Sequence, residues 1–326
     1  MSRGALVLTS LVVLSITVAG CTSSSAQAPT SAPEPTSTAM VERKSMELNI
    51  EGRILFVKDG NIWQWEQGNL KRLTGGGSDR QPQWSPDGAS IAYVEEDTSF
   101  SNLKLLHLAS STFTNLTNFR SPSGTGGVFV YRPVWSPDGT KIAYVSDQTT
   151  HDMNLWLMNA DGRSPRQLTS WDSYGGGIDC PTWSPDGKQI AFASFRTGVS
   201  QIWVYTVATA KWQQLTDNAD GAYDPSWSPD GKYIAYTARA RKLNDIWLMA
   251  PDGTGQTKIT ADGFSRAPTW SPDAEYLAYV SKKDQTFDAF AVRLQTNGNS
   301  HLSASEPKQL TKGQQIDPVS GLSWAR

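Results

Sequence analysis

Few side chains in this 326-residue sequence have the chemistry and the spacing of a catalytic site. The three histidines, His107, His151 and His301, are far apart and match no metal-ligand spacing, so a zinc site is not predicted. A Gly-x-Ser-x-Gly nucleophile elbow is missing, and no glycine-rich loop joins a strand to a helix. The sequence therefore favours neither a serine hydrolase nor a nucleotide-dependent enzyme.

The carboxylates and the cysteines add little to this chemistry. Aspartates at positions 217, 220 and 224 resemble a calcium loop, but the closing Glu and the required spacing are missing. Cys180 has no histidine near it in the sequence, so we interpret it as a structural residue. A catalytic site would need convergent carboxylates, for which Asp179, Asp224 and Asp317 are the candidates. We expect no catalytic residue, no metal and no cofactor.

A repeated motif organises the whole chain and positions these residues. Four copies read Trp-Ser-Pro-Asp-Gly, a fifth ends in Ala274, and a sixth is reduced to Ser323-Trp324. A period of roughly 40–50 residues is typical of propeller blades. Pro presets the backbone of a tight turn, Asp caps it and Gly accepts a positive φ, so we interpret the motif as scaffold and its aspartates as turn formers. The repeated tryptophans are Trp84, Trp135, Trp183, Trp227, Trp270 and Trp324.

The two ends of the repeat region complement each other. After each repeated Trp come three apolar runs, the last of which closes on Leu-Thr or Ile-Thr. The segment Arg53–Thr74 has these three runs without a Trp strand, and Gly321–Arg326 has the Trp strand alone. We therefore predict an all-β, six-bladed β-propeller over residues 50–326, closed by pairing of the N- and C-terminal strands. Ring closure protects strand edges that would otherwise promote aggregation.

The N-terminal segment has the pattern of a targeting signal. Residues 1–21 combine Arg3, an apolar stretch and Val18-Ala19-Gly20-Cys21, which resembles the lipobox of bacterial lipoproteins. That resemblance implies cleavage before Cys21 and acylation of its thiol. Residues 22–49 are rich in Ser, Thr, Pro and Ala, and we expect them to be a disordered tether.

Charge restricts the class of partner. The formal net charge is −2 with both signs spread along the chain, whereas nucleic-acid-binding surfaces are usually strongly basic. We therefore expect no nucleic-acid partner, and we expect a monomer.

The repeat unit resembles the WD40-like (PD40) repeat of the TolB propeller family. The resemblance rests on Pro-x-Trp-Ser-Pro-Asp-Gly-x-x-Ile-Ala-Tyr, x-Ile-Trp-x-Met, Asp-Gly and Gln-Leu-Thr, and covers about residues 50–326. It implies a place in the bacterial envelope, periplasmic or extracellular, and a protein partner such as a Pal-like lipoprotein. The separate α/β domain that precedes the propeller in that family is not recognisable here.

We expect recognition at one face of the ring, where loops join the fourth strand of each blade to the first strand of the next. Loops on a rigid scaffold commonly carry recognition, and aromatic side chains beside Arg and Asp suit a protein interface. The predicted binding residues are Asp79, Arg80, Phe119, Arg120, Phe129, Tyr131, Arg132, Trp171, Tyr174, Asp179, Tyr223, Asp224, Phe264, Arg266 and Asp317.

The sequence thus predicts a non-catalytic, lipid-anchored envelope protein that binds a protein or peptide with this loop face. Two alternatives stay open. A carbohydrate-binding or carbohydrate-processing propeller could stack a sugar ring on Trp171 or Tyr174, and a structural lipoprotein would have no specific partner.

Overall fold

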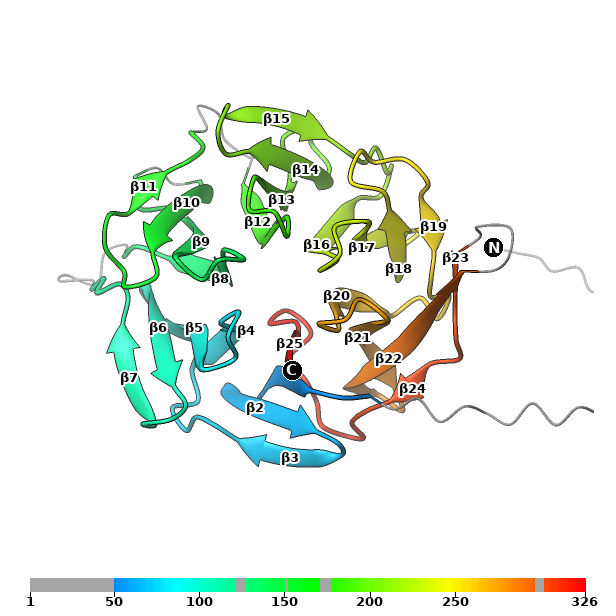
Figure 1. Cartoon of the computed structure of the whole chain (residues 1–326), viewed down its shortest axis with the longest axis horizontal. Coiled ribbons are helices and arrows are strands. Elements are labelled where there is room, and N and C mark those ends of the chain that lie inside the picture. The colour runs from blue at the N-terminus through cyan, green and yellow to red at the C-terminus, as the bar shows by residue number, and fades with distance from the viewer. Residues whose placement is uncertain (1–49, 121–126, 150–151, 171–176, 297–301) are drawn as a thin grey trace, which may run out of the picture. The chain divides into compact units, whose positions relative to one another are not determined.

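The computed structural model describes residues 50–120, 127–149, 152–170, 177–296 and 302–326. Six antiparallel sheets stand as blades around a central axis, as Figure 1 shows. None of the described residues forms a helix, and so none of them provides an apolar helix long enough to cross a membrane. This architecture confirms the predicted six-bladed, all-β propeller.

Each blade runs from an innermost strand at the axis to a short outermost strand. In blade order from the inside outwards, the strands are β25 (Ser323–Ala325), β1 (Arg53–Lys58), β2 (Asn61–Glu66) and β3 (Asn69–Arg72); β4 (Asp79–Trp84), β5 (Ser90–Glu96), β6 (Ser101–His107) and β7 (Thr112–Asn115); β8 (Val130–Trp135), β9 (Lys141–Ser146), β10 (Asn154–Asn159) and β11 (Arg166–Gln167); β12 (Ile178–Trp183), β13 (Gln189–Ser194), β14 (Gln201–Thr206) and β15 (Lys211–Gln214); β16 (Ala222–Trp227), β17 (Ile234–Ala240), β18 (Leu243–Met249) and β19 (Thr257–Lys258); and β20 (Arg266–Trp270), β21 (Tyr276–Lys283), β22 (Thr286–Thr296), β23 (Leu302–Ala304) and β24 (Lys308–Gln309).

The first blade is completed by both ends of the described chain. Strand β25 pairs antiparallel with β1, with Ile54 opposite Trp324. The guanidinium of Arg53 secures this junction, because its Nε donates to the carbonyl oxygen of Arg326 at 2.9 Å and its charge lies 4.4 Å from the centre of the Trp84 ring. Closure through the terminal strands is therefore as predicted.

The Ser-Pro-Asp-Gly segments form the turns between the first two strands of their blades. In one copy, the hydroxyl of Ser136 donates to the Asp138 carboxylate at 2.6 Å, and the backbone N–H of Gly139 donates to the Ser136 carbonyl oxygen. Gly139 has a φ of 69°, which only glycine adopts without strain. These bonds lower the pKa of Asp138, the largest effect coming from Ser136. The aspartate is thus a turn former, as expected.

The repeated alanines and tryptophans meet between blades. Ala143 of the third blade packs in one buried cluster with Trp183 of the fourth, and Ala278 of the sixth packs with Trp324 of the first. A small side chain on one blade leaves room for an indole on the next. Burial of such large rings dominates core energetics and locks the blades together.

The Leu-Thr ending of each repeat fixes the outer strand to the blade. Thr216 accepts a hydrogen bond from the backbone N–H of Ile202 at 2.9 Å and donates to Gln201 at 2.7 Å. The same backbone bond recurs at Thr74, where Ile62 is the donor. The hydroxyl thus satisfies a buried backbone donor that the short outer strand leaves free.

Candidate binding site at the loop face

The innermost strands carry an irregularity that shapes the central channel. Strand pairing shifts at a bulge in each of β4, β8, β12, β16 and β20. At each bulge a non-glycine residue adopts a left-handed φ of 48–55°, which costs roughly 1–2 kcal/mol per residue. The five residues are Gln81, Arg132, Cys180, Asp224 and Ala267.

These bulge residues line a narrow channel of about 110 Å³. Gly321, with a φ of 70°, lies just before β25 and lines the same space. The volume accommodates several water molecules, and the lining is partly polar. The bulges therefore turn side chains that a regular strand would alternate into a ring around the axis.

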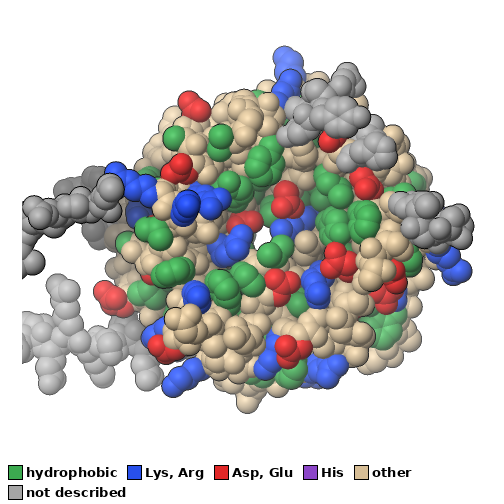
Figure 2. Space-filling model, turned by 180° about the vertical axis from the view of Figure 1, so that it is seen from behind, with side chains coloured by type: hydrophobic (Ala, Val, Ile, Leu, Met, Phe, Trp, Pro, Cys, Tyr) green, Lys and Arg blue, Asp and Glu red, His purple; other side chains and the backbone are tan. Residues whose placement is uncertain are grey.

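A larger pocket of about 710 Å³ opens beside the channel at the loop face. Its walls come from the starts of β4, β8 and β12, from the segment before β25, and from the turns between the second and third strands of three blades. Figure 2 shows this face, on which acidic and basic side chains gather around the central opening. Arg132, Gln81 and Ser320 line both this mouth pocket and the channel, so they separate the two spaces.

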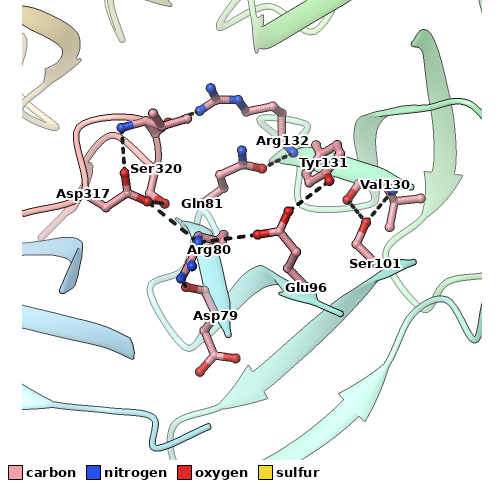
Figure 3. A network of polar contacts seen from close by, with 11 residues as sticks. Asp79, Arg80, Gln81, Glu96, Ser101, Val130, Tyr131, Arg132, Asp317 and Ser320 are labelled. Carbon is pink, nitrogen blue, oxygen red and sulfur yellow. Dashed lines mark hydrogen bonds and ion pairs between the residues drawn. The ribbon is translucent and has the colours of Figure 1, made fainter. Parts of the chain in front are cut away.

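A polar network holds one side of the mouth pocket in place (Figure 3). The Arg80 guanidinium lies 3.6 Å from Glu96 and 3.9 Å from Asp317. The Tyr131 hydroxyl donates to Glu96 at 3.0 Å, and burial, with help from Glu96, raises the pKa of Tyr131 far above its ordinary value. The tyrosine thus remains a hydrogen-bond donor at physiological pH.

Arg132 connects three parts of the ring. Its Nε donates to Asp179 at 2.8 Å, its Nη1 donates to the carbonyl oxygen of Val319 at 2.6 Å, and its backbone N–H donates to Gln81 at 2.8 Å. Burial alone would lower the pKa of the Arg132 guanidinium, but neighbouring Cys180 and the aspartates raise it above its ordinary value. The side chain is therefore a fixed cation across the inner wall of the pocket.

Cys180 lies deeper, where its thiol donates to the Asp224 carboxylate at 3.3 Å. Burial raises the pKa of the Cys180 thiol well above its ordinary value, so the reactive thiolate is disfavoured. Asp224 also accepts a hydrogen bond from Thr237 at 3.0 Å. The thiol and the carboxylate therefore serve as mutual packing partners, which agrees with the structural role expected for Cys180.

The structure brings together part of the predicted set. Arg80, Tyr131, Arg132, Asp179 and Asp317 line the mouth pocket. Asp224 lines the channel instead. Asp79 was expected at the surface but is only 4% exposed, and burial raises the pKa of its carboxyl.

Other predicted residues surround this centre without lining the pocket. Phe129 stacks on Tyr131 with ring centroids 6.1 Å apart, and Tyr223 meets Phe195 edge-on at 6.4 Å. Phe264 is 48% exposed, and no polar atom within the described parts of the chain bonds the buried Nε of Arg266.

Two further segments complete the account of the predicted set. Phe119 is anchored by its backbone N–H, which donates to Asn102 at 2.7 Å, and the next residue, Arg120, is exposed. Trp171 and Tyr174 lie outside the described residues.

Four lining residues were not predicted. Glu96, Met153 and Phe195 come from turns between second and third strands, and Val319 lies in the loop before β25. The prediction considered only loops between blades. Exposure of Phe195 (44%) and Val319 (52%) is the structural signal, because large apolar side chains that stay exposed together often mark an interaction site.

The residues weighed for metal chemistry do not assemble. Within the described ranges, no group of three or more His, Cys, Asp and Glu side chains could hold a metal ion. His107 contacts Ser90 and Thr114 on its own blade, and Asp220 accepts the backbone N–H of Arg241. His151 and His301 lie outside the described residues.

Comparison with known proteins gives consistent matches. The model of the PD40 family, the TolB beta propeller domain, matches residues 78–317. The "Tol-Pal system protein TolB" of Anaeromyxobacter dehalogenans is 36% identical over 90 residues, which are 27% of this chain and 18% of that protein. The "Uncharacterized peptidase YuxL" of Bacillus subtilis is 32% identical over 94 residues, 27% of this chain and 13% of that protein. The chain thus matches less than a fifth of either relative's length.

A solved structure extends the likeness to most of the ring. TolB from Acinetobacter baumannii superposes with a TM-score of 0.66 at 20% identity, covering 84% of this chain and 66% of that one. At this identity the likeness concerns the fold alone.

Proposed function

The chain belongs to the PD40 family of TolB β-propeller domains, and on that premise we propose that it is a non-catalytic envelope protein whose loop face binds a protein or peptide partner. The observation that carries the proposal is the mouth pocket of about 710 Å³, with apolar walls and a charged border, at the face where the interblade loops gather. Ligand pockets are commonly of ~300–1,000 Å³, with mainly apolar walls and a few polar groups that set orientation.

The chemistry of the pocket supports binding over catalysis. The carboxylates that a catalytic propeller would need are bonded to neighbours: Asp179 to Arg132, Asp224 to Cys180 and Thr237, and Asp317 to Ser320. A general acid or base must reach the proton that it transfers, and these groups are held as structural acceptors.

The partner in this proposal is another envelope protein. A relative carries the name of a Tol-Pal system protein, which supports a Pal-like lipoprotein as the first partner to test. The proposal treats the chain as a monomer that presents one loop face.

Anchoring by lipid is part of the same proposal and rests on the sequence. Cys21 at the end of the lipobox would carry the acyl groups, and residues 22–49 would separate the propeller from the bilayer. Replacement of Cys21 by Ser should move the protein from the membrane fraction to the soluble fraction. Retention of the variant in membranes after a high-salt wash would contradict the anchor.

Photo-crosslinking tests the binding face directly. A photoreactive amino acid at Val319, 52% exposed in the mouth pocket, should give a discrete protein adduct in intact cells, identified by mass spectrometry. The matched control position is Phe113, 53% exposed on the outer strand β7 and away from the pocket. Equal labelling from both positions, or none from Val319, would refute recognition by the loop face.

A further inference from the structure

The border of the mouth pocket carries an excess of acid. Three carboxylates, those of Glu96, Asp179 and Asp317, line the pocket with two guanidinium groups, those of Arg80 and Arg132. Their formal sum is −1, because three negative charges outnumber two positive ones. The field at this opening is therefore negative although the whole chain is nearly neutral.

The acidic groups are also the more accessible ones. The Asp179 side chain is 51% exposed and that of Glu96 is 36% exposed, whereas the Arg132 side chain is only 14% exposed. Arg132 uses its Nε on Asp179 and its Nη1 on the Val319 carbonyl oxygen. A ligand that enters the pocket meets carboxylate oxygens before it meets a free guanidinium group.

The carboxylates retain acceptor capacity. Asp179 Oδ1 accepts both Arg132 Nε and the backbone N–H of Cys180 at 2.8 Å, but Oδ2 has only a long contact of 3.5 Å to Arg132. Glu96 Oε2 lies 3.6 Å from Arg80 Nε, beyond good hydrogen-bond length. Each group can therefore accept a further donor without losing its internal partner.

Apolar side chains lie beside these acceptors. Val145 and Ile178 are almost fully buried beneath the pocket, while Phe195 and Val319 present about half of their surface to solvent. Burial of such surface yields about 25 cal/mol per Å², which makes the apolar wall the main source of affinity. The acceptors would then select orientation and partner.

We infer that the mouth pocket recognises an extended peptide segment in which a basic side chain adjoins an aliphatic or aromatic one. The inference rests on the proposed function and specifies the chemistry of the partner. The apolar side chain packs on Phe195 and Val319, and the basic side chain lays its methylene stem along the same wall and brings its charged end to Asp179 and Glu96. Complementary charge raises association rate and specificity more than affinity.

An acidic segment suits the pocket poorly. It would approach a negative border, and Arg132 could bind it only after leaving Asp179 and the Val319 carbonyl oxygen, which would leave polar groups unpaired. The sign of the preference is thus fixed by which charges already have partners.

Selection of peptides on the full-length protein tests the inference. Random decapeptides displayed on phage should be enriched in sequences with Lys or Arg next to Leu, Ile, Phe or Trp. The best peptide, synthesised with a fluorescent label, should lose at least about tenfold in affinity when its basic residue becomes Glu, measured by fluorescence polarisation on the unmodified protein. Its affinity should also fall as salt rises from about 0.05 to 0.5 M. Enrichment of acidic peptides, or equal binding of the charge-reversed peptide, would overturn the inference.

Matched variants locate the effect. Combined Asp179→Asn and Glu96→Gln should weaken the peptide about tenfold and abolish most of its salt dependence, since the amides keep the shape but not the charge. Combined Asp161→Asn and Glu66→Gln removes two negative charges away from the pocket and should change neither. Adducts at Val319 without a basic preference would reject the inference and leave the proposed function intact. Absence of adducts at Val319 would reject both.

Discussion

Replacement of Trp324 by Ala tests whether the terminal strand is part of one cooperative ring. Trp324 is 8% exposed, packs in a cluster with Ile54 and Ile316, and donates its indole N–H to the Glu51 carbonyl oxygen at 3.0 Å. Truncation of a buried Trp to Ala costs about 3–5 kcal/mol. In a domain of this size each kcal/mol lowers Tm by roughly 2–4 °C, so we expect a loss of about 6–20 °C.

The assay is urea unfolding followed by circular dichroism and tryptophan fluorescence, with hydrogen exchange of the β1 amides as a local probe. Phe113→Ala, at a residue 53% exposed on an outer strand, is the surface control and should change stability by less than about 1 kcal/mol. Trp135→Ala removes the equivalent residue of the third blade and should leave exchange in β1 slow. If Trp324→Ala unfolds like Phe113→Ala and β1 stays protected, the closure argument is wrong.

Three further predictions concern the interior. Thr216→Val leaves a buried backbone N–H unpaired and should cost about 1–3 kcal/mol in urea unfolding, whereas Thr209→Val at an exposed turn should cost almost nothing. In a Cys21→Ser background, Cys180 should resist a thiol reagent at about pH 8 and react only after unfolding, because burial raises the pKa of its thiol; rapid reaction of the folded protein would contradict this. Ala267→Gly should stabilise the protein by up to about 1 kcal/mol, since Ala267 has a φ of 52°, and a loss of stability would show that the bulge is not strained.

Much of the fold could be predicted because the repeats report on both local turns and packing. The Ser-Pro-Asp-Gly turns, the Ala-to-Trp contacts between blades and the pairing of Ile54 with Trp324 all follow from residue type and spacing. A blade that lacks its inner strand and a lone inner strand elsewhere leave one simple way to close the ring.

The site was less predictable because its shape depends on bulges and short turns. The sequence placed Arg80, Tyr131 and Asp179 on the correct side but did not indicate that Asp79 faces inward. Residues one apart in a strand point to opposite faces, so a bulge decides which side chain reaches the pocket. The contribution of Phe195 could be recognised only once the turns were placed in space.

The pairing of β1 with β25 also sets a temporal order for folding. Ile54 must wait for Trp324, 270 residues later by position number, before the innermost edge of its sheet is covered. Contacts between such distant positions carry a large loop-closure entropy and form late. During synthesis the early blades therefore remain an open arc with a bare strand edge, and completion of the circle coincides with release of the last residues from the ribosome.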